Sequence, residues 1–105
     1  MREASVVYAY VQDVPIHEEL YRRIVDELGP DPLAGSLLHL CVRTAEGLRY
    51  IDVWESEEHC ARAFDERVHP AVDRAFGGRR PPVEPVVTHL EVIDARGALM
   101  PGTGS

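Results

Sequence analysis

The sequence predicts an α+β fold in which a four-stranded antiparallel sheet carries two helices on one face. Segments rich in β-branched and aromatic residues alternate with amphipathic segments in the order βαββαβ. Only a tight turn separates the second and third strand segments, as in a hairpin. The pattern fits within 105 residues, enough for one hydrophobic core. This order is that of the ferredoxin-like domains.

Local composition predicts the first strand and the first helix. Residues 4–12, ASVVYAYVQ, are rich in strand-forming side chains, and a turn follows at Asp13–Pro15. From Leu20 to Leu28, apolar residues recur at three- and four-residue spacing, and Gly29–Pro30 ends the segment. This spacing predicts an amphipathic helix of about three turns.

The stretch SLLHLCVRTAEGLRYIDVWE predicts two strands that turn at Ala45, Glu46 and Gly47. We expect a three-residue loop with Gly47 at positive φ. Glutamate is a poor choice for the positive φ that a two-residue primed turn requires. The three-residue loop pairs Thr44 with Leu48.

The register of this hairpin decides which strand residues share a face, since a shift of one residue moves every side chain to the other face. The three-residue loop places Leu38 and Leu40 beside Asp52 and Trp54. A two-residue loop would instead place His39 beside Asp52 and Trp54. We expect the first register, which separates His39 from Trp54.

The second helix is expected to begin after Ser56, a good N-cap residue. Pro70 predicts a kink or break near His69, because proline restricts the preceding residue and removes a backbone donor. Residues 83–94 predict the fourth strand. Residues 1–94 are thus expected to form one ferredoxin-like domain, and residues 95–105 a flexible C-terminal tail.

Composition and charge exclude several classes of partner. Acidic residues outnumber basic ones 18 to 11, and the net charge of -7 repels phosphate backbones and anionic lipid. We therefore expect neither nucleic acid nor a membrane as a partner. No secretory segment follows Met1, so a cytoplasmic protein is expected. Cys41 and Cys60 form no CxxC pair and are predicted to be reduced core thiols.

Both faces of the predicted sheet are apolar. On the first strand, for example, Val6 and Tyr8 alternate with Val7 and Ala9. Two helices cover one face, and a solvated face of an antiparallel sheet normally carries polar residues. We therefore expect a homodimer in which a second copy of the chain covers the other face.

Three segments resemble the dimeric α/β-barrel superfamily, and within it the small proteins grouped with the antibiotic biosynthesis monooxygenases. They are GSLLHL, GLRYIDVWESEEHCARAFDERVHPAV and PVVTHLEV, and the resemblance covers roughly residues 4–93. It implies a ligand cavity between sheet and helices in each subunit, and often cofactor-free chemistry on an aromatic substrate. The superfamily also includes polyketide cyclases, haem-degrading oxygenases, enzymes that decompose chlorinated lactones, and members with no assigned reaction.

Asp52 and Trp54 are candidate site residues on the third strand. A carboxylate within a central strand is costly unless it is paired. Asp52 is interpreted either as the partner of Arg43, Arg49 or a residue of a second subunit, or as a base. Trp54 is interpreted either as a core residue whose indole N–H bonds a carbonyl, or as a wall that stacks on a planar ligand.

Histidines and aromatic residues complete the candidate site. His39 and His89 lie in strands among apolar residues, and a histidine titrates near neutrality, which suits proton transfer. Each is interpreted either as a hydrogen-bonded, partly buried histidine or as a base. His69 either caps a helix or leans over a cavity mouth. Five further aromatic residues belong either to the core or to a pocket: Tyr8, Tyr10, Tyr50, Phe64 and Phe76.

No motif for a metal or a nucleotide is present, because the histidines are scattered and no glycine-rich loop joins a strand to a helix. We therefore expect no cofactor and no metal. The hypothesis is a cofactor-independent monooxygenase, or a related enzyme such as a polyketide cyclase, acting on a small aromatic or polyketide-like molecule. The alternatives are a non-catalytic binding or structural protein and a haem-binding or haem-degrading protein. A pocket bounded by at least two of His39, Asp52, Trp54 and His89 distinguishes the enzyme from the structural protein.

Overall fold

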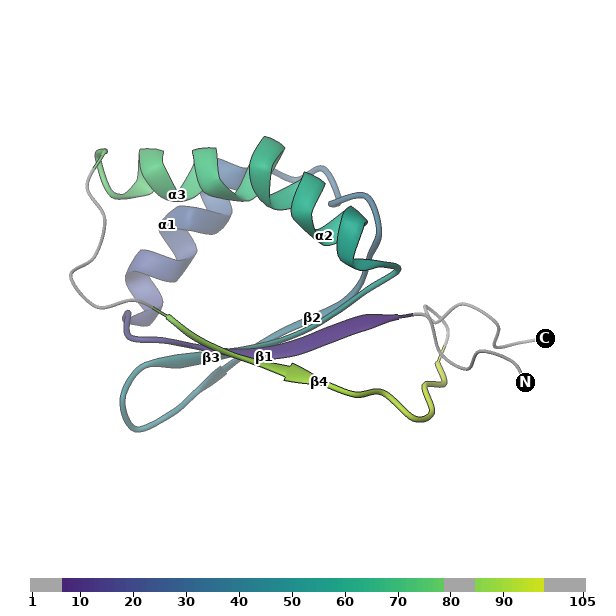
Figure 1. The fold of residues 1–105 in the computed structure, drawn as a ribbon. Coiled ribbons are helices and arrows are strands. Elements are labelled where there is room, and N and C mark those ends of the chain that lie inside the picture. Colours follow the sequence, from purple (N-terminus) through teal and green to yellow (C-terminus); the bar gives the residue numbers. More distant parts are fainter. Residues whose placement is uncertain (1–6, 79–84, 98–105) are drawn as a thin grey trace.

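The computed structural model describes residues 7–78 and 85–97. Parts of the first and fourth expected strands and most of the expected tail lie outside these residues. Figure 1 shows the helices together over one face of the sheet. In chain order the elements are β1 (Tyr8–Val14), α1 (Glu18–Leu28), β2 (Ser36–Arg43), β3 (Leu48–Trp54), α2 (Glu57–Ala63), η1 (Phe64–Val68), α3 (His69–Ala75) and β4 (Val86–Leu90).

The strands lie in the order β2-β3-β1-β4, and every neighbouring pair is antiparallel. With the helices on one face, this topology confirms the predicted ferredoxin-like α+β fold. The central strands are β3 and β1, whereas β2 and β4 form the edges. Within the described ranges, none of the helices combines the length and the apolar composition that a bilayer crossing requires.

Caps and one ion pair hold α1 over the sheet. At its start, Nδ1 of His17 accepts a hydrogen bond from the backbone N–H of Leu20 at 3.3 Å. At its end, Gly29 has a φ of 86°, in the left-handed region that favours glycine. The carboxylate of Glu18 pairs with Arg43 on β2. This contact ties the first turn of α1 to the edge of the sheet.

The second helical segment begins as predicted, with the hydroxyl of Ser56 accepting a hydrogen bond from the His59 N–H at 3.1 Å. The predicted interruption near His69 takes the form of a wide turn. The segment η1 is π-helical, and the His69 N–H donates to the carbonyl of Phe64, five residues back. Pro70, which has no backbone N–H to donate, then lies in the first turn of α3.

The β2-β3 hairpin has a two-residue loop, so the expected three-residue loop is wrong. The Thr44 N–H donates to the carbonyl of Gly47 at 2.8 Å, leaving only Ala45 and Glu46 between them. No described non-glycine residue has a positive φ, so Glu46 is not strained. The Thr44 hydroxyl closes the turn by accepting from the Gly47 N–H at 3.1 Å, and Gly47 itself takes a φ of 156°.

The observed register moves His39 onto the face that was expected to exclude it. His39 lies directly opposite Asp52, and Leu38 opposite Val53. The prediction that Leu38 and Leu40 share a face with Asp52 is therefore wrong. The helix-facing side of the sheet instead carries His39, Asp52 and the residues that alternate with them.

The core between the sheet and the helices is thin. Its central cluster consists of Tyr10, Trp54, Cys60 and Ala63. Among the described residues, Ala71 reaches 0% exposure, but no large side chain is fully buried. Both cysteines are free thiols, with Cys60 buried and Cys41 half-buried. Protein interiors are normally close-packed. A core with so few buried large side chains therefore leaves space for a cavity under the helices.

The opposite face of the sheet is apolar and exposed. Leu40, Val42 and Leu90 are 45%, 39% and 43% exposed, respectively. Their strand neighbours place all three on the side of the sheet away from the helices. No described element covers this side in Figure 1.

Candidate functional site

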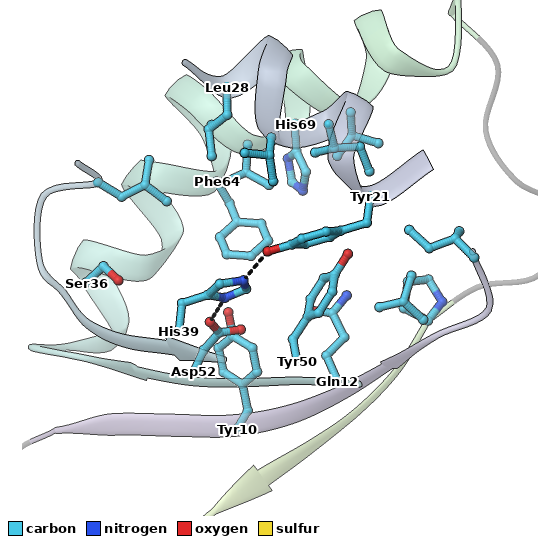
Figure 2. Close-up of a pocket in the computed structure, with 18 of the residues that line it drawn as sticks. Tyr10, Gln12, Tyr21, Leu28, Ser36, His39, Tyr50, Asp52, Phe64 and His69 are labelled. Carbon is cyan, nitrogen blue, oxygen red and sulfur yellow. Dashed lines mark hydrogen bonds and ion pairs between the residues drawn. The ribbon is translucent and has the colours of Figure 1, made fainter. Parts of the chain in front are cut away.

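A cavity of about 480 Å³ lies between the sheet and the helical layer. Its apolar wall comes from the helices and the loop after α1, and the sheet supplies most of its polar side chains (Figure 2). Among the described residues that line it, Asp52 is the only carboxylate, and no lysine or arginine is present. The main apolar residues of the wall are Ile24, Leu28, Leu33, Val68, Val72 and Phe76.

A chain of hydrogen bonds joins Tyr21, His39 and Asp52 at the polar end of the cavity. Nδ1 of His39 lies 2.5 Å from Oδ1 of Asp52, and Nε2 lies 2.8 Å from the hydroxyl of Tyr21. Figure 2 shows Tyr21 reaching down from α1 to the histidine on β2, with Asp52 behind it on β3. We call this arrangement the Tyr21-His39-Asp52 chain.

The protonation of the chain follows from its acceptors. An ionised carboxylate only accepts hydrogen bonds, so when His39 is neutral its contact with Asp52 requires the hydrogen on Nδ1. The free lone pair on Nε2 then accepts the hydroxyl hydrogen of Tyr21. Asp52 is 6% exposed, whereas the side chain of His39 is 41% exposed. The histidine is therefore oriented by a buried carboxylate while its ring remains open to the cavity, an arrangement suited to a general base.

Two tyrosines flank the histidine. The Tyr50 ring lies 5.5 Å from the Tyr21 ring and 5.4 Å from the His39 ring, between ring centroids. Burial raises the pKa of Tyr50, and burial followed by the nearby Cys41 and Asp52 raises that of Tyr21. Both phenols are therefore neutral near pH 7 and can donate hydrogen bonds. In residues 7–78 and 85–97, no group bonds the hydroxyl of Tyr50, which lines the cavity.

Trp54 forms a rigid part of the cavity wall. It is 3% exposed, and its indole N–H donates to the hydroxyl of Tyr10 at 3.2 Å rather than to a carbonyl. The hydroxyl of Tyr10 also lies 3.8 Å from Sγ of Cys60. Burial, then the charge of Asp52, raises the pKa of Tyr10. Phe64 lies 6.2 Å from the indole, between ring centroids, and extends the aromatic wall toward the helices.

The cavity brings together most of the residues predicted for the site. Tyr8 and His89 are not among those that line it. His89 faces Tyr10 from the edge strand β4, where it is exposed and its ring lies 5.4 Å from that of Tyr8. The residues predicted for the site that do line the cavity are His39, Asp52, Trp54, Tyr10, Tyr50, Phe64, His69 and Phe76.

The expected arginine partners of Asp52 are engaged elsewhere. Arg43 pairs with Glu18, and Arg49 lies 2.7 Å from Asp13. The interpretation that Asp52 pairs with Arg43 or Arg49 is therefore wrong. Arg43 shares the sheet face of Asp52 but is held by Glu18 on α1, and Arg49 alternates onto the other face of β3. The observed register brings His39 to the carboxylate instead. The cavity is bounded by three of the four residues chosen to distinguish an enzyme from a structural protein.

Sequence reasoning missed Tyr21, which was assigned only to the apolar stripe of the first helix. Its hydroxyl was the available signal, because a tyrosine on a buried stripe needs a hydrogen-bond partner. In the described part of the chain, no group of histidine, cysteine and acidic side chains could hold a metal ion. The ring of His59 packs against Gly35 and bonds the hydroxyl of Ser56 at 2.7 Å.

Comparison with solved structures shows the same fold in a protein of Caulobacter crescentus CB15 described as a putative antibiotic biosynthesis monooxygenase. The two chains superpose with a TM-score of 0.63 and 14% sequence identity, and the match covers 86% of this chain and 92% of the other. No protein-family model matches the chain. No curated protein matches it in sequence. At this identity the likeness concerns the fold alone.

Proposed function

We propose that the protein is a cofactor-independent monooxygenase of the antibiotic biosynthesis monooxygenase group that acts on a small aromatic or polyketide-like molecule. The observation that carries the proposal is the Tyr21-His39-Asp52 chain at the wall of a cavity of about 480 Å³. A base of this kind generates an electron-rich anion from a phenol or an enol, and such anions react with dioxygen. The shared fold with the Caulobacter protein supports this choice among proton-transfer reactions.

The cavity favours a neutral, planar substrate. Its apolar wall and its aromatic side chains suit a ring system, whereas a carboxylate or phosphate on the ligand would meet Asp52 with no arginine among the described lining residues to balance it. Trp54 and Phe64 supply flat surfaces for the ring. The hydroxyl of Tyr50, which bonds none of the described residues, is placed to donate a hydrogen bond to a carbonyl or phenolate oxygen of the substrate.

The chemistry balances with dioxygen as the oxidant. Removal of the hydroxyl proton from the enol form of an anthrone gives the same anion as loss of a proton from its CH₂ group, and this anion transfers one electron to dioxygen. The two radicals combine to a peroxide on the same carbon, and loss of water leaves a carbonyl. One oxygen atom enters the product, the other leaves as water, and His39 returns its proton. The imidazolium formed in between is stabilised by the buried carboxylate of Asp52.

We propose further that the active form is a homodimer. The apolar outer face of the sheet, which includes Leu40, Val42 and Leu90, is the part of the described surface that a second copy would cover. A sheet-on-sheet contact would bury this face in both subunits, as expected for a symmetric interface. The cavity lies on the other side of the sheet and stays accessible in such a dimer.

One observation favours a non-catalytic binding protein instead. Both ring nitrogens of His39 already have partners, so the chain is satisfied without any ligand. The two functions differ in turnover. The purified protein should accelerate the oxidation of anthrone-type or quinol substrates under dioxygen, with the initial rate proportional to protein concentration. Binding without acceleration for all of these substrates would leave the non-catalytic function.

A further inference from the structure

The hydroxyl of Tyr21 already occupies the position from which a proton would reach His39. Its oxygen lies 2.8 Å from Nε2, the ring nitrogen that does not bond Asp52. We propose that Tyr21 is a catalytic residue that accepts the acidic proton of the substrate while it passes its own proton to His39. This inference rests on the proposed function and identifies the group that touches the reacting proton.

The structure holds the phenol of Tyr21 in place. Its ring is nearly parallel to that of His39, with 14° between the planes, and packs against the ring of Tyr50. One turn earlier on α1, Glu18 pairs with Arg43 on the same strand as His39. A substrate that displaced the phenol would have to separate these contacts. A substrate that bonds to the phenol oxygen leaves all of them intact.

A tyrosine hydroxyl has one hydrogen to donate and two lone pairs to accept with. In Tyr21 the hydrogen is used on His39, and the thiol of Cys41 also interacts with this hydroxyl and takes at most one of its two lone pairs. Because the side chain lines the cavity, the other lone pair is left to accept from a ligand. Tyr21 therefore presents a hydrogen-bond acceptor to the substrate, and His39, on the other side of the phenol, is the base that takes up the proton. This arrangement selects a substrate with an acidic hydroxyl or enol, and it rejects the corresponding methyl ether, which has no hydrogen to donate.

The proton transfers balance within the chain. The O–H bond of the substrate breaks, and its proton joins the oxygen of Tyr21 as the original Tyr21 proton moves to Nε2 of His39. The electron pair stays on the substrate, Tyr21 ends neutral, and the positive charge rests on His39 beside Asp52. Burial and the charge of Asp52 raise the pKa of Tyr21. A free tyrosinate is thus disfavoured, and the two transfers occur together.

The test compares Tyr21→Phe with Tyr8→Phe, which also removes one phenol oxygen but at a position outside the cavity lining. The substrate is anthrone, whose enol form carries the acidic hydroxyl. With it, Tyr21→Phe should lower kcat roughly 100-fold or more and change KM only a few-fold. Tyr8→Phe should keep the native values. Full kcat in Tyr21→Phe, together with loss of kcat in His39→Gln, would overturn the relay and leave the proposed function standing.

A second measurement tests the relay without oxygenation. 4-Nitrophenol absorbs visible light as the phenolate, so its spectrum reports proton loss in the cavity. The native protein and Tyr8→Phe should ionise bound 4-nitrophenol at a lower pH than free 4-nitrophenol, and Tyr21→Phe should lose at least half of that shift. An unchanged shift in Tyr21→Phe would contradict the relay. If the native protein oxidised no substrate, the proposed function would fail while this assay still decided the role of Tyr21.

Discussion

His39 and Asp52 lie opposite each other on β2 and β3, and Nδ1 of the histidine is 2.5 Å from Oδ1 of the aspartate. Asp52 is the buried charged side chain of the described core. A buried carboxylate is costly unless it is paired, and His39 is its partner. The histidine in turn gains a fixed orientation toward the cavity.

Asp52→Asn should abolish most of the activity while the fold persists. Asparagine keeps the shape of the side chain and an oxygen for the Nδ1 hydrogen, but it removes the charge that stabilises the imidazolium. We expect kcat for anthrone oxidation to fall roughly 100-fold or more. Asp13→Asn is the matched control, because Asp13 forms an exposed ion pair with Arg49. An equal loss of kcat in both variants would indicate a general effect of charge rather than a role for the pair.

Filling the cavity should block the ligand. Trp54 is the single tryptophan of the chain and lines the cavity, so its fluorescence reports binding of a flat probe such as anthraquinone. Val72→Phe places extra volume in the cavity and should weaken binding about tenfold or more. Ala61→Phe adds a ring on an exposed part of α2 and should leave the affinity unchanged. Identical titration curves for the native protein and Val72→Phe would place the ligand elsewhere.

Leu40→Glu should produce a monomer. The substitution puts a charge into the apolar outer face, which the proposed dimer buries, and a buried unpaired charge is costly. Sedimentation velocity should show a dimer for the native chain and a monomer for Leu40→Glu. Ala61→Glu adds the same charge on the helical layer and should remain dimeric. A native chain that sediments as a monomer at all concentrations would contradict the proposed homodimer.

Stability should fall in alkaline solution. Burial raises the pKa of all four tyrosines above the ordinary value of 10.0. A group whose pKa is higher in the folded state stabilises the protein below its unfolded pKa, and this contribution is lost as the pH rises through the folded pKa. The free energy of unfolding in urea should therefore decline above pH 10.0. Phenolate absorbance that appears in the folded protein well below that pH would contradict the burial of these residues.

The fold could be predicted from the sequence because it depends on periodicity and on local signals. The stripe from Leu20 to Leu28, the cap at Ser56 and the turn before Leu48 each act within a few residues. The interruption predicted at Pro70 is also local, but it takes the form of a π-helical turn rather than a break in the helix.

The candidate site was harder to predict, because it depends on the register of the β2-β3 hairpin. The observed two-residue loop has no positive φ at Glu46, and the Thr44 hydroxyl accepts from the Gly47 N–H, a turn that the local preferences did not anticipate. Only that register brings His39 to Asp52. Tyr21 comes from a different element, so its contact with His39 depends on how α1 packs on the sheet.

Chemical rescue of His39→Ala tests whether His39 is the base. The variant removes the base and leaves a space that added imidazole can enter, since the side chain of His39 is 41% exposed. The account predicts that dioxygen uptake with anthrone falls roughly 100-fold or more in His39→Ala. It also predicts that uptake returns as imidazole is added, in proportion to the neutral imidazole present. Dioxygen uptake at the native rate in His39→Ala without imidazole would contradict it.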